Sequence, residues 1–252
     1  MSSLQRRSER LAESAFLGGP PRDFERMGRH CLEVLLGEGL TTSSKVLDVG
    51  CGALRAGYWL MRLLDPGHYF GIEPNREMLT LGLEQLVEPD VVARAQARFA
   101  NNEDFDFSGF GETFDFALAR SIWTHTSRDQ ITTMLKSFAD TATPDGVLLA
   151  SYLPQSAIVS RVRRWRPGVE RFASELPLER LTPALARLPR VGSHGYTGQG
   201  WVGRSHESTT AGTVRHGLPW LTASAREQGL RLELTSHRVL NGQYWLRVRR
   251  AG

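Results

Sequence analysis

The sequence of 252 residues is poor in cysteine and in long apolar runs. Its two cysteines, Cys31 and Cys51, show no ligand-like spacing to a histidine or a second thiol, so neither a disulfide framework nor a zinc site is indicated. The longest apolar runs, such as residues 146–153, are far shorter than the ~20 residues of a membrane helix. The first residues also lack the apolar stretch of a signal peptide. We therefore expect a cytoplasmic protein without a membrane segment.

Lysine is almost absent, since Lys45 and Lys136 are the only lysines among 31 basic residues, and the net charge is +4. An arginine-rich chain is typical of anion binding through guanidinium groups. A GC-rich genome produces the same bias without any function, and this explanation is the favoured one. With 40% hydrophobic residues, the chain is long enough to bury the core of one α/β domain with an appended lobe.

Strand and helix patterns alternate over residues 45–153. Such alternation predicts parallel strands joined by right-handed helical crossovers, which is a doubly wound sheet. Residues 23–39 carry apolar side chains at helical spacing and predict a helix before the first strand, with Asp23 as its cap. The alternation therefore predicts an α/β fold that a helix precedes.

The end of the chain follows another pattern. Residues 219–229 predict one more helix, and residues 230–250 predict two strands joined around Asn241 and Gly242, a typical hairpin signal. The parallel sheet is therefore expected to end in an antiparallel hairpin, which a plain dinucleotide dehydrogenase lacks.

Residues 154–217 interrupt both patterns with prolines, glycines, ten arginines and four glutamates, a net charge of +6. This segment follows the fifth predicted strand, near the carboxyl edge where open α/β sheets bind ligands. We expect an inserted lid or substrate-binding lobe. A solvated surface excursion is the alternative.

The stretch KVLDVGCGALRAG (residues 45–57) places Gly50 and Gly52 after a buried strand, where the backbone can turn tightly beside a ligand. Arg55 stands where a dinucleotide fingerprint requires its last glycine, so that fingerprint fits poorly. Asp48 would repel a pyrophosphate, but it could accept a hydrogen bond from an ammonium group, directly or through water. The turn therefore favours a ligand with a positively charged end.

Glu73 ends the second predicted strand, roughly twenty residues beyond the turn, where a carboxylate accepts ribose hydroxyls in nucleoside-binding α/β folds. A solvated cap is the alternative for a glutamate that ends a strand. Together with the glycine turn, Glu73 indicates a nucleoside with an amino-acid end.

Five motifs resemble, in order and spacing, those of the class I S-adenosylmethionine-dependent methyltransferases: VLDVGCG, FGIEP, RFANNEDFDF, FDFALARS and PDGVLLASYL. DVGCGALRAG, YFGIEPN and SIWTHTS are similar to a bacterial subgroup without a firmly assigned substrate. The resemblance implies a Rossmann-like, seven-stranded, mostly parallel sheet with a C-terminal antiparallel hairpin and an inserted lid, and S-adenosylmethionine as cofactor with S-adenosylhomocysteine as product. We expect an N-terminal helical segment (1–44), a cofactor-binding core (45–153), an inserted substrate-binding lid (154–217), and a C-terminal helix and hairpin (218–252).

The resemblance also implies the cofactor contacts. Leu54 replaces the third glycine that is commoner in the family, and we expect its side chain to pack into the first helix. Arg55 is our hypothesis for the methionyl carboxylate, and an arginine that points into water is the alternative. The expected contacts are Asp48, Gly50 and Gly52 for the methionyl part, Glu73 for the ribose, and Asn102 or Asp104 for the adenine amino group. Asn75 and Ser121, which lie beside these motifs, are also expected to contact the cofactor.

Histidines supply the candidates for a catalytic base. His125 follows the fourth strand, where the family places residues that face the methyl group, and it would titrate near neutrality. The alternative is that His125 caps the following helix together with Ser127. His194 and His206, in the insertion, are the rival candidates. The irregular spacing of the insertion's histidines argues against a metal site.

The fourth strand lacks an Asn or Asp followed by Pro-Pro-aromatic, the family's signature for amine methylation in nucleic acids and proteins. The aromatic residues of the insertion are not interleaved with arginines as a stacking platform for nucleic acid. The main hypothesis is therefore O-methylation of a small molecule, including an anionic one, in bacterial specialised metabolism, by a monomer or homodimer. The alternatives are an RNA or peptide acceptor bound through the basic insertion, and a non-catalytic relative that serves protein interaction. A dehydrogenase is the least favoured.

Overall fold

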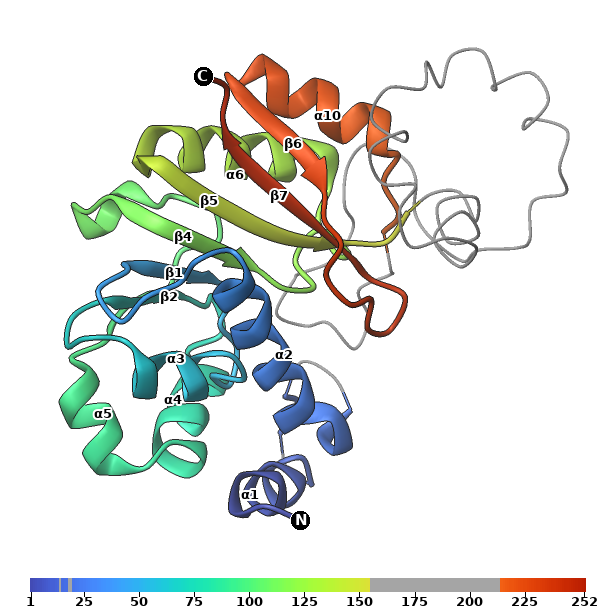
Figure 1. Cartoon of the computed structure of the whole chain (residues 1–252). Helices are drawn as coiled ribbons and strands as arrows, with labels where there is room; N and C mark the ends of the chain where they lie inside the picture. Colours follow the sequence, from blue (N-terminus) through green and yellow to red (C-terminus); the bar gives the residue numbers. More distant parts are fainter. Residues whose placement is uncertain (14, 18–19, 155–213) are drawn as a thin grey trace, which may run out of the picture.

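A single sheet of seven strands organises the protein, of which the computed structural model describes all residues except 14, 18–19 and 155–213. The strand order is β3-β2-β1-β4-β5-β7-β6. The first five strands run parallel, and β7 lies antiparallel between β5 and β6 (Figure 1). The strands are β1 (Val46–Val49), β2 (Tyr69–Ile72), β3 (Arg98–Ala100), β4 (Phe114–Ala119), β5 (Ala142–Tyr152), β6 (Leu230–Leu234) and β7 (Tyr244–Arg250).

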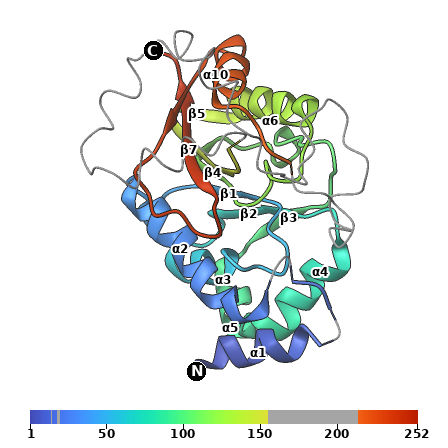
Figure 2. The same cartoon turned by 90° about the vertical axis from the view of Figure 1, so that its right-hand side faces the viewer.

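Helices cover both faces of the sheet, with α2 to α5 on one face and α6 and α10 on the other (Figures 1 and 2). The N-terminal helix α1 packs on the outside of the first layer, against α2 and η2. The described helices are α1 (Ser3–Leu11), η1 (Pro21–Asp23), α2 (Phe24–Gly37), α3 (Gly57–Leu63), α4 (Arg76–Leu81), η2 (Gly82–Leu86), α5 (Pro89–Ala95), η3 (Ser108–Phe110), α6 (Arg128–Thr141) and α10 (Leu218–Glu227). No helix in this part of the chain is long and apolar enough to cross a membrane.

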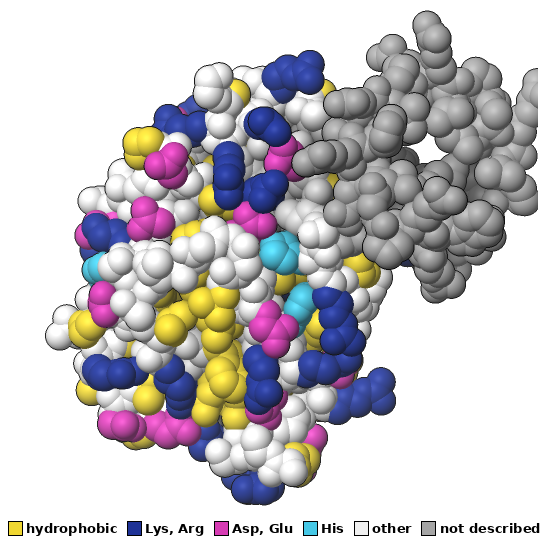
Figure 3. Space-filling view, in the orientation of Figure 1, with side chains coloured by type: hydrophobic (Ala, Val, Ile, Leu, Met, Phe, Trp, Pro, Cys, Tyr) yellow, Lys and Arg dark blue, Asp and Glu magenta, His cyan; other side chains and the backbone are white. Residues whose placement is uncertain are grey.

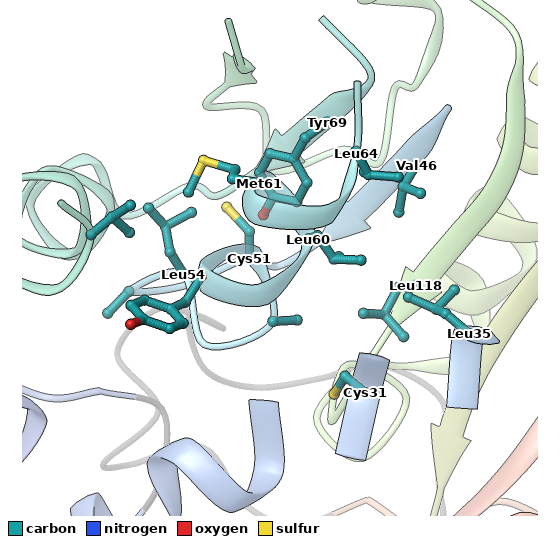
Figure 4. Packing of buried hydrophobic residues seen from close by; sticks show 14 of the residues in the cluster. Cys31, Leu35, Val46, Cys51, Leu54, Leu60, Met61, Leu64, Tyr69 and Leu118 are labelled. Carbon is teal, nitrogen blue, oxygen red and sulfur yellow. The ribbon is translucent and has the colours of Figure 1, made fainter. Parts of the chain in front are cut away.

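The core consists of two apolar layers, because successive side chains of a strand point to opposite faces of the sheet. Val46 of β1 belongs to the same cluster as Leu35 of α2 and Leu60 of α3, which Figure 4 labels, whereas Leu47 belongs to the layer on the α6 side. All residues of β1 and β2 are buried, as expected for central parallel strands that are covered on both faces. These layers hold the carboxyl ends of the central strands rigidly at one edge.

The predicted helix over residues 23–39 is confirmed as α2, but the prediction that Asp23 caps it is wrong. Asp23 makes no capping hydrogen bond, and its carboxylate pairs instead with Arg26 at 2.7 Å. The physical reason is that Asp23 ends the short helix η1 with φ −103° and ψ 0°, whereas a capping side chain needs an extended backbone.

The predicted C-terminal hairpin is confirmed. Asn241 and Gly242 both have positive φ, 53° and 71°, which is the backbone of a two-residue hairpin turn. Leu240 and Gln243 pair across this turn in an isolated bridge. The hairpin therefore adds β6 and β7 to the parallel sheet, as the resemblance implied.

The described residues on either side of the insertion lie together. Pro154 and His216 form a parallel bridge, and the backbone N–H of His216 donates to the Leu153 carbonyl at 3.1 Å. The N–H of Val214 donates to the carbonyl of Thr124 at 2.7 Å, beyond the end of β4. The segment 154–217 therefore leaves and rejoins the fold at the carboxyl edge, although residues 155–213 lie outside the described part.

Candidate functional site

The glycine turn after β1 is built from three residues with left-handed backbone. Gly50 and Gly52 have φ 68° and 56°, and Leu54 has φ 63°. A Cβ at Gly50 would lie 2.3 Å from the Cδ1 atom of Ile122, at the tip of a side chain in the loop after β4, and the φ of 68° also favours glycine here. Leu54 is fully buried and belongs to the core cluster of Figure 4, which confirms that it packs inward. The packing of this side chain offsets a left-handed backbone that costs about 1–2 kcal/mol.

Asp48 lies inside β1 and is only 3% exposed. Its Oδ2 accepts a hydrogen bond of 2.9 Å from the hydroxyl of Tyr69, on the neighbouring strand β2. Burial raises the pKa of Asp48 to about 7, although the hydrogen bond from Tyr69 acts in the opposite direction. The carboxyl group is therefore poised to change charge near neutral pH when a cation approaches it.

Glu73 follows β2 directly and is 5% exposed. Its Oε2 accepts a hydrogen bond of 2.9 Å from the N–H of Gly52, and its Oε1 accepts one of the same length from the N–H of Asn75. The carboxylate is thus fixed against the glycine turn at the carboxyl edge, 21 residues along the chain from Gly52.

Comparisons with known proteins agree with this geometry. Residues 47–148 match a family model described as a methyltransferase domain. This stretch contains β1 to β4 and most of β5. The chain contains a methyltransferase domain with the class I fold.

Solved structures share the fold of this methyltransferase. Magnesium protoporphyrin IX methyltransferase (ChlM) from Synechocystis PCC 6803, with bound S-adenosylhomocysteine, matches with a TM-score of 0.55 and 15% identity, over 98% of this chain and 94% of that chain. DhpI in complex with S-adenosylhomocysteine matches with the same values. Human N-acetylserotonin methyltransferase matches with a TM-score of 0.55 and 12% identity, over 99% of this chain and 57% of that one. No curated protein matches the methyltransferase in sequence.

An orphaned polar atom in the loop after β3 fits a nucleoside. The Oδ1 atom of Asn102 is buried and has no hydrogen-bond partner among the described residues, while its Nδ2 donates to the carbonyl of Asp106 at 2.9 Å. A buried acceptor without a partner is unfavourable, and an exocyclic amino group such as that of adenine would satisfy it. Asp104 is exposed, and its Oδ1 accepts from the N–H of Asp106 at 3.2 Å. Asn102 is therefore better placed for the adenine than Asp104, and both assignments stay predictions.

Asn75 and Ser121 reach the same edge through different contacts. The side chain of Asn75 caps α4 by accepting from the N–H of Met78 at 3.0 Å, so Asn75 supports Glu73 only through its backbone. Ser121 has φ 63°, and its N–H donates to the Oγ of Ser151 at 2.7 Å. Cofactor contacts of Asn75 and Ser121 remain predictions.

Arg55 is half-buried, and it is not paired with an acid among the described residues. Its Nη2 donates to the carbonyl of Leu17 at 2.7 Å, and its Cζ lies 5.3 Å from the ring centroid of Phe24. Arg55 thus ties the segment before α2 to the glycine turn. Its predicted contact with the methionyl carboxylate stays a prediction.

His125 lies in the turn between β4 and α6, where its backbone N–H donates to the carbonyl of Ile122 at 2.9 Å. The cap of α6 is a capping box formed by Ser127 and Gln130, so this cap does not depend on His125. His194 and His206 lie outside the described residues. Within the described ranges, no group of three or more His, Cys, Asp or Glu side chains could hold a metal ion.

Sequence reasoning missed two residues of this edge. Tyr69 begins β2, where the apolar sequence indicated only a buried strand. Nothing in the sequence indicated its hydrogen bond to Asp48. Arg120 follows β4 and is half-buried at the carboxyl edge, and the charge pattern did not distinguish it from the 28 other arginines.

Proposed function

We propose that this methyltransferase transfers the methyl group of S-adenosylmethionine to an oxygen atom of a small molecule. The observation that carries the proposal is the buried carboxylate of Glu73, fixed by the N–H of Gly52 at the carboxyl edge of the sheet. This arrangement suits the two hydroxyls of a ribose. The cofactor supplies an electrophilic methyl group, so the protein has to align the acceptor and, for a hydroxyl, remove its proton.

Two observations support a small acceptor. On the face seen in Figure 3, Lys and Arg side chains are interspersed with Asp and Glu over the described residues, which is unlike a continuous basic groove for RNA. Of the matching structures, ChlM is named for magnesium protoporphyrin IX and the human enzyme for N-acetylserotonin, both of them small molecules. We propose residues 154–217 as the segment that encloses the acceptor, in bacterial specialised metabolism.

Binding of S-adenosylhomocysteine, measured by isothermal titration calorimetry, tests the cofactor half of the proposal. Glu73→Gln should weaken binding at least tenfold, because it removes a charged acceptor of hydrogen bonds. Glu77→Gln is the matched control, since Glu77 is exposed on α4 and should bind with wild-type affinity. Wild-type protein that shows no binding at millimolar ligand would refute the enzymatic reading.

The acceptor half is tested with radiolabelled S-adenosylmethionine and panels of hydroxylated small molecules, total RNA and peptides. Transfer to a hydroxyl compound supports the proposal, whereas transfer confined to RNA or peptide supports the alternative. On an active hydroxyl acceptor, His125→Asn should lower turnover ~10²–10⁴-fold if His125 is the general base. An unchanged turnover between pH 6 and 9 would remove His125 from that role.

A further inference from the structure

Arg120 is an arginine that the fold holds in place at the carboxyl end of β4. Its Nη1 donates to the Oγ of Ser151 at 2.9 Å and also to the Oε1 of Gln243. Its Cζ lies 5.5 Å from the ring centroid of Trp245, which is 1% exposed. One nitrogen and one face of the guanidinium are thus fixed by neutral side chains.

The remaining nitrogens of this guanidinium lack partners. Nε is buried and has no hydrogen bond to a described residue, and Nη2 likewise donates to none of them. No carboxylate of the described residues forms an ion pair with Arg120. Arg120 is half-buried, and a partly desolvated charge without a counterion is unfavourable, so the site favours an anion that the described residues do not provide.

The surroundings strengthen this preference. Burial lowers the pKa of Arg120 to about 10, and the nearby Arg55 lowers it further, although the side chain still carries its charge at neutral pH. Arg55 is itself bonded to a neutral carbonyl group, so its positive charge adds to that of Arg120 without an acid to balance it among the described residues. The Nε and Nη2 edge is the one with which an arginine grips both oxygens of a carboxylate.

The strand order indicates which carboxylate would reach Arg120. Along the carboxyl edge, the neighbouring strands β3, β2, β1 and β4 end at Asn102, Glu73, the glycine turn and Arg120. Under the proposed function, on which this inference rests, the adenine lies at the first of these positions and the ribose at the second. The amino-acid end of the cofactor then extends over β1 toward β4. We propose that Arg120, rather than Arg55, binds the carboxylate of the amino-acid end of S-adenosylmethionine.

Two neighbours act as positioning residues in this arrangement. The Oγ of Ser151 accepts from both Arg120 and the backbone N–H of Ser121, and it donates to Gln243 at 2.7 Å. Gln243 belongs to the turn of the C-terminal hairpin, just before β7. The hairpin that completes the sheet thus also orients the proposed clamp.

Calorimetric titration with two probes tests the proposal. S-adenosylhomocysteine carries the carboxylate, whereas 5′-methylthioadenosine keeps the nucleoside and the thioether but lacks the amino-acid end. Arg120→Met should weaken S-adenosylhomocysteine binding at least tenfold and change methylthioadenosine binding less than twofold. Arg128→Met is the matched control, because its guanidinium also stacks on a tryptophan, Trp220, at 4.9 Å, and both affinities should stay within twofold.

Equal losses for both probes, or no loss for either, would overturn the assignment of Arg120. If Arg120→Met does not fold, Arg120→Lys carries the test, since a lysine keeps the charge but loses the two-pronged grip. A selective loss of S-adenosylhomocysteine affinity in Arg120→Lys supports the proposal, and wild-type affinity for both probes overturns it. A wild-type protein that binds neither probe would instead refute the proposed function, so the two failures are distinguishable.

Discussion

The substitution Asp48→Asn should stabilise the ligand-free protein at alkaline pH while it weakens cofactor binding. In the folded protein, burial raises the pKa of Asp48 from 3.8 to about 7. The contribution of this carboxyl to stability is therefore fully present below pH 3.8, and it is lost as the pH rises through about 7. A difference of about 3 pKa units corresponds to at most about 4 kcal/mol of unfolding free energy at pH 8.

Asparagine keeps an oxygen that can accept the hydrogen bond from Tyr69, but it does not ionise. Urea denaturation without ligand should show a small difference between wild type and Asp48→Asn near pH 4.5. At pH 8 the variant should be more stable, by up to about 4 kcal/mol. S-adenosylhomocysteine binding should fall at least tenfold at pH 8, because the variant lacks the negative charge that would face the ligand's ammonium group.

Asp115→Asn is the control, and it should change stability at pH 8 in the opposite direction. The carboxylate of Asp115 accepts a hydrogen bond of 2.9 Å from the N–H of Lys45 and contacts Thr143, so its removal should lower stability at pH 8. If Asp48→Asn also lowers stability at pH 8, interactions in the site stabilise the ionised carboxylate of Asp48. The argument that its burial destabilises the folded protein at this pH would then be wrong.

Three further changes test the scaffold. Ser127→Ala removes the capping hydrogen bond to the N–H of Gln130 and should lower the unfolding free energy by about 1 kcal/mol in urea. Leu54→Gly relieves about 1–2 kcal/mol of left-handed backbone strain but loses packing worth about 2–5 kcal/mol. Urea denaturation should therefore show a lower free energy of unfolding, and a higher one would contradict this balance. Burial lowers the pKa of His216, whose Nε2 lies 3.1 Å from the Thr126 carbonyl oxygen, so its contribution to stability is present above pH 6.5 and is lost as the pH falls. The stability difference between wild type and His216→Gln should accordingly narrow from pH 7 to pH 5, and a difference that widens would refute this sign.

The fold could be predicted from the sequence because its signals are local and repeated. Each central strand is a short apolar run between turn residues, and each crossover helix follows at the expected length. The hairpin turn at Asn241 and Gly242 depends on two residues that tolerate positive φ, and both can be recognised from the sequence alone. The cap at Asp23 failed for a tertiary reason, since Pro21 starts a short helix that leaves Asp23 with the wrong backbone.

The site was predictable only as far as it follows from strand ends. Glu73 and the glycine turn come together because β1 and β2 are paired, so their spacing in the sequence fixes their distance in space. The partner of Asp48 could not be predicted in this way, because the bond from Tyr69 depends on which face each side chain takes. The orphaned acceptor of Asn102 is a property of the folded loop alone.

The two arginines at this edge show where sequence reasoning ends. Position in the motif favours Arg55, which stands in the first turn beyond the glycines. In the fold its Nη2 donates to the Leu17 carbonyl. Helix α2 also crosses close to Arg55, since a Cβ at Gly28 would lie 2.1 Å from the Arg55 carbonyl oxygen. Arg120 has no motif, yet it emerges one strand further along the edge with its Nε buried and without a described partner. The Nε of Arg55 is likewise buried without a partner, but its Nη2 is already bonded to the Leu17 carbonyl. Arg120 uses only Nη1 toward described residues, so it keeps both Nε and Nη2 for the two oxygens of a ligand carboxylate. The energetic argument therefore assigns the carboxylate to Arg120 on grounds that only the packed structure supplies.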